Sequence, residues 1–274
     1  MTTVDTFVTS EASFMSSAHL ISGQQDAILV DAAFSKSDAQ ALTRWVKASG
    51  KRLTTVFITH AHPDHFLGLP VITESFPGVQ AVATPAVAEE LQKVAPTYHA
   101  TFAPVYGDDL AADYALAEPL TGSELDLEGE TIKVIEVGAG EADVSSALYV
   151  PSIKAVATGD QVFNGIHVWL VEYRPEGSLE GIRRIREAGP IDVVLPGHGP
   201  AGGPELLDAN ERYIRDFMAA AATATTKDEG VAKMLEKYPD YDLPVILDFG
   251  MQAAVEGKSY PQIMQEFLRG TSEG

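Results

Sequence analysis

The chain has 274 residues, 45% of them hydrophobic and 21% charged, so it can bury one large core or two small ones. Its 39 acidic and 19 basic side chains give a formal net charge of -20, which argues against nucleic-acid binding through phosphates and against an anionic membrane surface. The absence of cysteine excludes disulfides and thiolate chemistry, and no apolar run reaches the roughly 18 residues of a membrane-spanning helix. The first residues carry neither a basic region nor an apolar signal core, so we expect a cytoplasmic protein.

The first half of the chain alternates between strands and helices. Short apolar runs rich in β-branched residues predict strands over 26–31, 53–59 and 79–83. Helical spacing of apolar residues predicts helices over 35–49, 67–76 and 85–94, the last with a proline in its first turn. Residues 96–120, rich in Pro, Ala, Tyr and Asp, are predicted to form a long irregular connection.

The second half begins with strands and ends in helices. Strands are predicted over 131–137, 145–150, 154–158, 167–173 and 191–195, with a helix over 179–188. Residues 204–269 have an almost wholly helical pattern, broken near 238–244. We therefore predict an α/β core over residues 1–203 and a helical C-terminal extension over 204–274. Apolar stripes on the extension, at Ile214 and Phe217 and at Met264 and Phe267, are expected to pack on the core, with a lid or a homodimer contact as alternatives.

Three of the seven histidines fall in the segment 60–65, which reads His-Ala-His-Pro-Asp-His. In an extended segment residues i and i+2 point to the same side, so His60 and His62 can bind one ion. Pro63 then turns the chain, and Asp64 and His65 begin a helix from which they can reach a second ion. Imidazole and carboxylate donors suit zinc and also manganese and iron. We therefore predict one or two Zn²⁺ ions, with Mn or Fe as alternatives.

This segment, at the end of an apolar strand, resembles the HxHxDH signature of the metallo-β-lactamase superfamily. Three other landmarks of that family occur in the expected order: Asp31 at the end of an early strand, Thr158-Gly-Asp160 after the strand 154–157, and Pro196-Gly-His198-Gly after 192–195. The resemblance covers residues 5–215 and implies a four-layer αβ/βα sandwich, with residues 1–203 as its catalytic domain. It implies that Asp160 bridges two metals and that His198 completes the second site with Asp64 and His65.

The sequence departs from the family pattern at one ligand. The family normally has a further histidine, often in a Gly-His-Thr segment, between the strands 131–137 and 145–150, where this chain has Ala139. Glu141 and Asp143 follow. We expect both to be solvent-exposed loop acids, and the alternative is that one of them turns inward to complete the first site. Three accounts then fit: one metal in the second site, two metals with a water in place of the missing ligand, or a degraded site.

The resemblance implies a metal-dependent hydrolase, and we interpret its substrate as a small ester, lactone or amide attacked by a metal-activated water. The alternative is a non-catalytic or impaired relative that binds a small ligand, because Ala139 cannot bind metal. Either way the expected partner is a small molecule. Asp64, if freed from the metal, is a candidate to pass a proton to the leaving group.

Residues shortly after Asp160 are predicted to line the substrate pocket, because Asp160 lies at the metal edge. They are Phe163, Asn164 and His167, and His167 is also a candidate for proton transfer. Trp169 is expected to pack in the core. Phe14 and Phe102 are weaker candidates for the mouth of the pocket.

Overall fold

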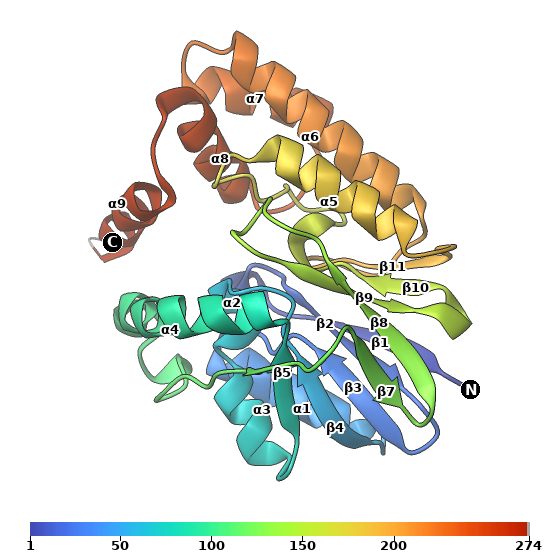
Figure 1. Ribbon diagram of the computed structural model, residues 1–274. Helices are drawn as coiled ribbons and strands as arrows, with labels where there is room; N and C mark the ends of the chain where they lie inside the picture. Colours follow the sequence, from blue (N-terminus) through green and yellow to red (C-terminus); the bar gives the residue numbers. More distant parts are fainter. Residues whose placement is uncertain (273–274) are drawn as a thin grey trace.

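The computed structural model describes residues 1–272 and has two β-sheets packed face to face between layers of helices (Figure 1). The predicted four-layer α/β sandwich with a C-terminal helical extension is therefore confirmed. The first sheet has the order β1-β2-β3-β4-β5-β6, and the second has the order β11-β10-β9-β8-β7. The strands of the first sheet are β1 Thr3–Val8, β2 Ser17–Ser22, β3 Asp26–Val30, β4 Arg52–Phe57, β5 Gln80–Ala83 and β6 Glu118–Pro119. Those of the second are β7 Glu124–Leu127, β8 Glu130–Glu136, β9 Ser146–Val150, β10 Ala155–Ala157 and β11 Val193–Leu195.

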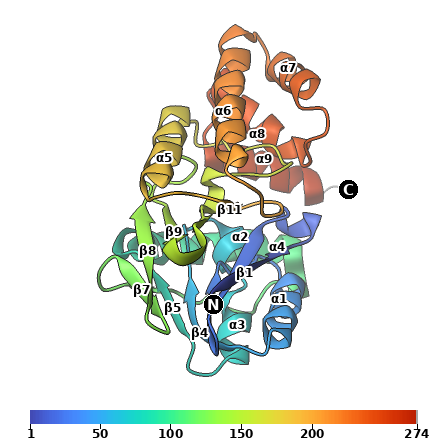
Figure 2. The same ribbon diagram turned by 90° about the vertical axis from the view of Figure 1, so that its right-hand side faces the viewer.

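The two sheets bury apolar side chains against each other and against the outer helices. Between the sheets, Ile28, Val30 and Phe57 pack in one cluster with Leu148 and Val150. The outer face of the first sheet is covered by α1 (Lys36–Ala48), α3 (Leu69–Ser75) and α4 (Pro85–Tyr106). The second sheet is covered by α5 (Pro175–Glu187) and α6 (Glu205–Thr223), which Figure 2 shows on the side of the molecule away from α1 and α3.

Helix α4 is longer than predicted. It continues to Tyr106, so the prediction of an irregular connection is wrong for residues 96–106. Pro96 and Pro104 lie inside the helix, where each removes a backbone donor. The helix nevertheless persists because Ala95 and Phe102 are buried in the core of the first sheet.

The predicted strand over 167–173 is absent. Val168 and Leu170 instead pack in the cluster that the extension forms with the second sheet, and the His167 N–H donates to the carbonyl of Asp242 over 3.1 Å. A short apolar run can be buried under helices as well as in a sheet, and periodicity does not separate the two cases. The strands β1 and β2, which extend the first sheet ahead of residue 26, were not recognised from the sequence.

The C-terminal extension consists of α6, α7 (Lys227–Lys237), α8 (Pro244–Glu256) and α9 (Tyr260–Ser272). The predicted break near 238–244 lies between α7 and α8. Ile214 and Phe217 are buried in the outer core of the second sheet, as expected for packing on the core. Helices α8 and α9 return toward α4, across the edge at which the two sheets meet (Figure 1). Among the described residues, no helix combines the length and apolar character needed to cross a membrane.

Candidate metal centre

The segment 60–65 lies where the edges of the two sheets meet. After β4 the chain stays extended to His60, which forms an isolated bridge with Ser145 just ahead of β9. The Ser146 N–H also donates to the Thr59 carbonyl over 2.9 Å. The short helix α2 (Pro63–Phe66) then begins at Pro63, whose fixed φ suits a first helical turn. These contacts hold the histidine segment against the second sheet.

One group of metal-binding side chains consists of His60, His62, Glu141 and Asp160, whose candidate ligand atoms all lie within 4.8 Å of one another. Glu141 Oε2 is 3.6 Å from His62 Nδ1 and 3.8 Å from His60 Nε2. Two ligands about 2.1 Å from one tetrahedral ion lie roughly 3.4 Å apart. The spacing therefore suits atoms that surround a common ion.

A second group consists of Asp64, His65 and His198. Asp160 adjoins it as well, because Oδ2 lies 3.2 Å from His198 Nε2 and Oδ1 lies 3.1 Å from His65 Nε2. The same Oδ2 is 3.7 Å from His60 Nε2 in the first group. The structure thus brings together all six side chains that the sequence singled out as metal ligands, with Asp160 between the two groups.

Glu141 is the residue that sequence reasoning misjudged. It was expected to be solvent-exposed, yet only 1% of it is exposed and its carboxylate faces His60 and His62. Asp143 is exposed as expected and pairs with Arg174. Ala139, at the position expected for a histidine, is itself exposed. The available signal was an acid two residues beyond the expected ligand, but the sequence did not show which way its side chain points.

The loop that carries Glu141 is held against the start of α5. The Arg174 Nε–H donates to the Gly140 carbonyl over 3.1 Å. A Cβ atom on Gly177 would lie 2.1 Å from the Ala139 carbonyl oxygen, so the close approach of loop and helix requires glycine there. This packing turns Ala139 outward and Glu141 inward.

Several buried candidate ligand atoms in the two groups have no hydrogen-bond partner. They are His60 Nε2, His65 Nε2, Glu141 Oε2 and Asp160 Oδ1. His65 Nε2 and Asp160 Oδ1 lie 3.1 Å apart but form no hydrogen bond with each other. A buried polar atom without a partner is costly, and native proteins rarely tolerate several together. Imidazole nitrogens and carboxylate oxygens aimed at the same space are suitable ligands for a divalent cation, so the residues present fit a metal centre.

Surrounding hydrogen bonds orient these imidazoles. Asp31 Oδ2 lies 2.9 Å from His65 Nδ1, and the Thr59 N–H donates to Asp31 Oδ1 over 2.9 Å. The Thr59 hydroxyl lies 2.9 Å from His60 Nδ1. With Nδ1 engaged in this way, both rings turn Nε2 toward the cluster, which is the usual arrangement behind metal-binding histidines.

His198 and His62 are oriented by other parts of the chain. The carbonyl of Phe14 lies 2.7 Å from His198 Nδ1, and the Phe163 ring stacks on His198 at a centroid distance of 4.7 Å with 7° between the planes. His62 Nε2 is 3.4 Å from a Glu172 carboxylate oxygen, which leaves Nδ1 facing Glu141. Phe163 thus acts on the cluster by positioning His198.

Burial and close charges shift the pKa values of the cluster. Burial raises the pKa of Glu141 to about 8. Burial would lower the pKa of His198, but Asp160 and Asp64 outweigh it and raise that pKa to about 10. Since a metal ligand must be deprotonated, a cation has to displace protons from both groups, and its affinity rises with pH.

A narrow cleft of about 30 Å³ lies over the cluster. It is bordered by His62, Pro63, Asp64, Asp160 and His198, and by the apolar and aromatic side chains of Phe14, Phe102, Trp169, Ile246, Tyr260 and Met264. Ile246 belongs to α8 and Tyr260 and Met264 to α9, so the extension covers the cleft. Trp169, which was expected to pack in the core, is half-buried against the apolar clusters of the extension and also borders the cleft.

The residues predicted to bind substrate lie elsewhere. Phe163 is 3% exposed behind His198, and the Asn164 side-chain amide donates to the Pro200 carbonyl over 2.8 Å. His167 is buried, with Nδ1 2.7 Å from the Tyr213 hydroxyl. The chain after residues 159–161 turns beneath α6 instead of following the cleft, so the structure places all three outside its lining. A catalytic role for His167 stays a prediction.

The chain is similar to known proteins in sequence. The model of the metallo-beta-lactamase superfamily matches residues 13–198. A hydroxyacylglutathione hydrolase of Acidiphilium cryptum (strain JF-5) is 27% identical over 192 residues, which are 69% of this chain and 67% of that protein. A metallo-beta-lactamase type 2 of Bacillus cereus is 25% identical over 193 residues, 66% of this chain and 65% of that protein.

Solved structures share the fold. TMB-1 superposes with a TM-score of 0.60 at 18% identity, over 77% of this chain and 92% of that one. The metallo-beta-lactamase from Pontibacter korlensis superposes with a TM-score of 0.59 at 19% identity, over 73% of this chain and 87% of that one. The matches to the curated relatives span about two thirds of their length, and the family match ends before α6.

Proposed function

Because the chain belongs to the metallo-beta-lactamase superfamily, we propose that it is a metal-dependent hydrolase of a small ester, lactone or amide. The observation that carries the proposal is the pair of buried donor groups that share Asp160 and contain four donor atoms without a hydrogen-bond partner. The similar proteins named as a hydroxyacylglutathione hydrolase and a beta-lactamase support hydrolysis as the reaction class.

Two sets of side chains would hold the cations. The first set is His60, His62, Glu141 and Asp160, and the second is Asp64, His65, Asp160 and His198. Divalent cations bound there would lower the pKa of a water molecule and polarise the carbonyl oxygen of the substrate. Zinc is the first candidate, and manganese and iron remain candidates because mixed nitrogen and oxygen donors select only weakly among these metals.

Asp64 is the proposed proton carrier. Its carboxylate borders the cleft and is the most exposed of the carboxylates in the cluster, with 11% of the side chain accessible. Burial would raise the pKa of Asp64, but the charges of His65 and His198 lower it, so the group is ionised. When its carboxylate is released from the cation, Asp64 can accept a proton from the attacking water and deliver it to the leaving oxygen or nitrogen.

The apolar walls exclude bulk water from the reacting group. Phe14, Phe102 and Trp169 border the cleft beside the cluster. Side chains of α8 and α9 cover the cleft. In such a site each charge interaction is stronger than it would be in water. The non-catalytic alternative rested on Ala139, and we propose that Glu141, which faces His60 and His62, takes the place of the missing ligand.

The proposal is tested by measuring metal content and hydrolysis together. The purified protein is assayed with 4-nitrophenyl acetate, δ-valerolactone and 4-nitroacetanilide, then stripped with a chelator and reloaded with Zn²⁺, Mn²⁺ or Fe²⁺. We expect about two metal equivalents per chain and a turnover that is lost on stripping and restored on reloading. The Asp160→Asn variant should show no turnover. Asp108→Asn, the same chemical change on an exposed acid away from the cluster, is the control. Metal binding without turnover of any substrate would overturn the proposal.

A further inference from the structure

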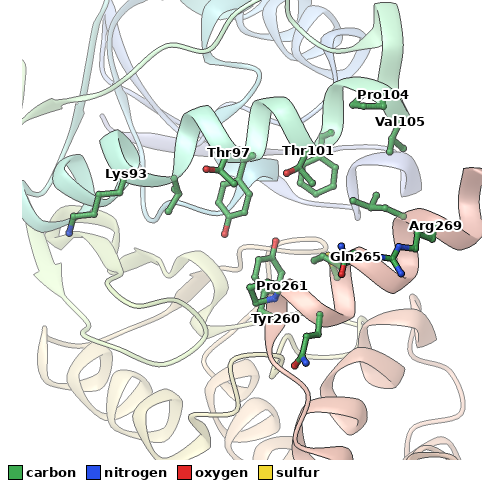
Figure 3. A pocket seen from close by; sticks show the side chains of 15 residues that line it. Lys93, Thr97, Thr101, Pro104, Val105, Tyr260, Pro261, Gln265 and Arg269 are labelled. Atoms are coloured by element: carbon green, nitrogen blue, oxygen red, sulfur yellow. The ribbon is translucent and has the colours of Figure 1, made fainter.

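A second, much larger hollow adjoins the metal cleft. It is a groove of about 920 Å³ between α4 and α9, within the 300–1,000 Å³ that ligand pockets usually occupy. Figure 3 shows the facing side chains of the two helices along it. Its walls include Val94, Tyr98 and Val105 on α4, and Leu268 on α9. The Val105 side chain is 46% exposed, which leaves apolar surface open to the solvent.

The groove is continuous with the metal cleft, because Phe102, Tyr260 and Met264 border both. A row of rings also joins them. The ring centroids of His62 and Trp169 lie 5.6 Å apart, those of Trp169 and Tyr260 lie 6.0 Å apart, and those of Tyr260 and Tyr98 lie 6.3 Å apart. The row leads from His62, a candidate metal ligand, to Tyr98 in the wall of the groove.

The two hollows differ greatly in capacity. The cleft measures about 30 Å³, which is about the share of liquid volume that one water molecule occupies. It can hold little more than the reacting group of a substrate. The remainder of a larger substrate can extend from the cleft into the groove along the wall that the two share.

We propose that the α4–α9 groove binds the linear aliphatic chain of the substrate, so that the preferred substrates are esters, lactones or amides with a medium or long acyl chain. This inference rests on the proposed hydrolase function and specifies its substrate class. The scissile carbonyl lies at the cluster, the first methylenes pass Tyr260 and Met264, and the chain continues between the two helices. A flexible apolar chain fits an elongated apolar groove because each buried methylene is removed from water.

The distribution of polar groups agrees with such a chain. Thr97 and Thr101 lie one helical turn apart on α4 and contribute uncharged hydroxyls to the lining. Figure 3 shows the basic side chains Lys93 and Arg269 at opposite ends of the row of lining residues. The other lining residues, which also include Gln262 and Gln265, are uncharged, so between its ends the groove presents apolar and neutral polar side chains. The net charge of -20 makes the protein a poor general attractor of anions.

The first test measures binding without chemistry. Calorimetric titrations of the stripped and the metal-loaded protein with 1-hexanol, 1-octanol and 1-decanol are compared. We expect affinity to rise with each added methylene, by up to about fourfold, the fold-change that corresponds to about 0.8 kcal/mol per buried CH₂. Thr97→Trp fills the groove and should abolish the chain-length dependence. Ala100→Trp, on an exposed position of α4 outside the lining, should retain it.

The second test separates this inference from the hydrolase proposal. The kcat/KM for 4-nitrophenyl acetate, hexanoate and decanoate should increase with chain length in the unmodified enzyme, and Thr97→Trp should lose the gain for decanoate while still hydrolysing acetate. Acetate turnover with no chain-length dependence would overturn the groove assignment and leave the hydrolase proposal intact. Chain-length-dependent alcohol binding that Thr97→Trp abolishes, without turnover of any ester, would support the groove and overturn the hydrolase proposal. A dimer that Thr97→Trp dissociates, with no alcohol binding, would make the groove a subunit contact and overturn the inference.

Discussion

The Oε2 atom of Glu141 lies 3.6 Å from Nδ1 of His62, and both residues are buried. With Asp160 nearby, this contact makes the first donor group one of two imidazoles and two carboxylates. Two carboxylates balance the charge of a dication, and oxygen donors suit manganese and iron as well as zinc. The second group has the same composition once Asp160 is counted, so the two sites are chemically alike.

Glu141→Gln should empty the first site. The amide keeps the shape of the side chain but removes the negative charge and one strong oxygen donor. We expect the metal content to fall from about two equivalents to about one, because the second site does not involve Glu141. Metal analysis by mass spectrometry checks this, with Glu74→Gln at an exposed position of α3 as the matched control. Two retained equivalents in Glu141→Gln would show that Glu141 is not a ligand.

Ala139→His should leave metal content and turnover unchanged. Position 139 is exposed, and its carbonyl packs against Gly177, so a histidine there projects into solvent. The same metal analysis and ester assay apply. An increase in bound metal would mean that the loop can change conformation and direct the side chain of residue 139 toward the cluster.

Asp31→Asn should weaken metal binding without removing a ligand. Asp31 accepts the His65 Nδ1–H and so keeps Nε2 directed at the second site. Loss of such an orienting carboxylate typically lowers metal affinity about 10–100-fold. Competition with a chromophoric chelator measures the change. Asp26→Asn, at the opposite end of β3 from Asp31 and in a surface ion pair with Arg52, should bind metal like the unmodified protein.

Acidification should destabilise the protein through His19. Burial lowers the pKa of this imidazole from 6.5 to about 4, while Nε2 donates to the Pro196 carbonyl over 2.9 Å. Between these pH values the unfolded chain binds the additional proton, so the stability that His19 contributes is complete above pH 6.5 and is lost as the pH falls toward 4. The slope reaches at most about 1.4 kcal/mol per pH unit.

Urea unfolding at several pH values checks this prediction. His19→Gln should show a smaller loss of unfolding free energy between pH 7 and pH 4.5 than the unmodified chain, because glutamine does not titrate. An NMR titration gives an independent readout. A midpoint near 6.5 for His19 in the folded protein would contradict the prediction.

The features that the sequence predicted correctly are those set by neighbours along the chain. Runs of β-branched apolar residues led to β3, β4 and β9, and apolar spacing led to α1 and to the helices of the extension. The arrangement of the metal-binding side chains in segment 60–65 could also be predicted from neighbouring residues alone. The alternation of side chains in an extended segment and the turn at Pro63 place its ligands with no knowledge of the rest of the fold.

Contacts between distant segments decided the rest. Glu141 points inward because its loop is held by Arg174, just before α5, and by Gly177, on α5. No pattern within residues 137–145 encodes that contact. Helix α4 passes through Pro96 and Pro104 because burial of Phe102 outweighs the local preference to stop. The walls of the cleft come from Phe14, Trp169 and Met264, which are far apart in the sequence. Backbone geometry acts over a few residues and can be recognised in the sequence, whereas side-chain direction and cavity shape depend on which segments pack together, and only the tertiary structure determines that.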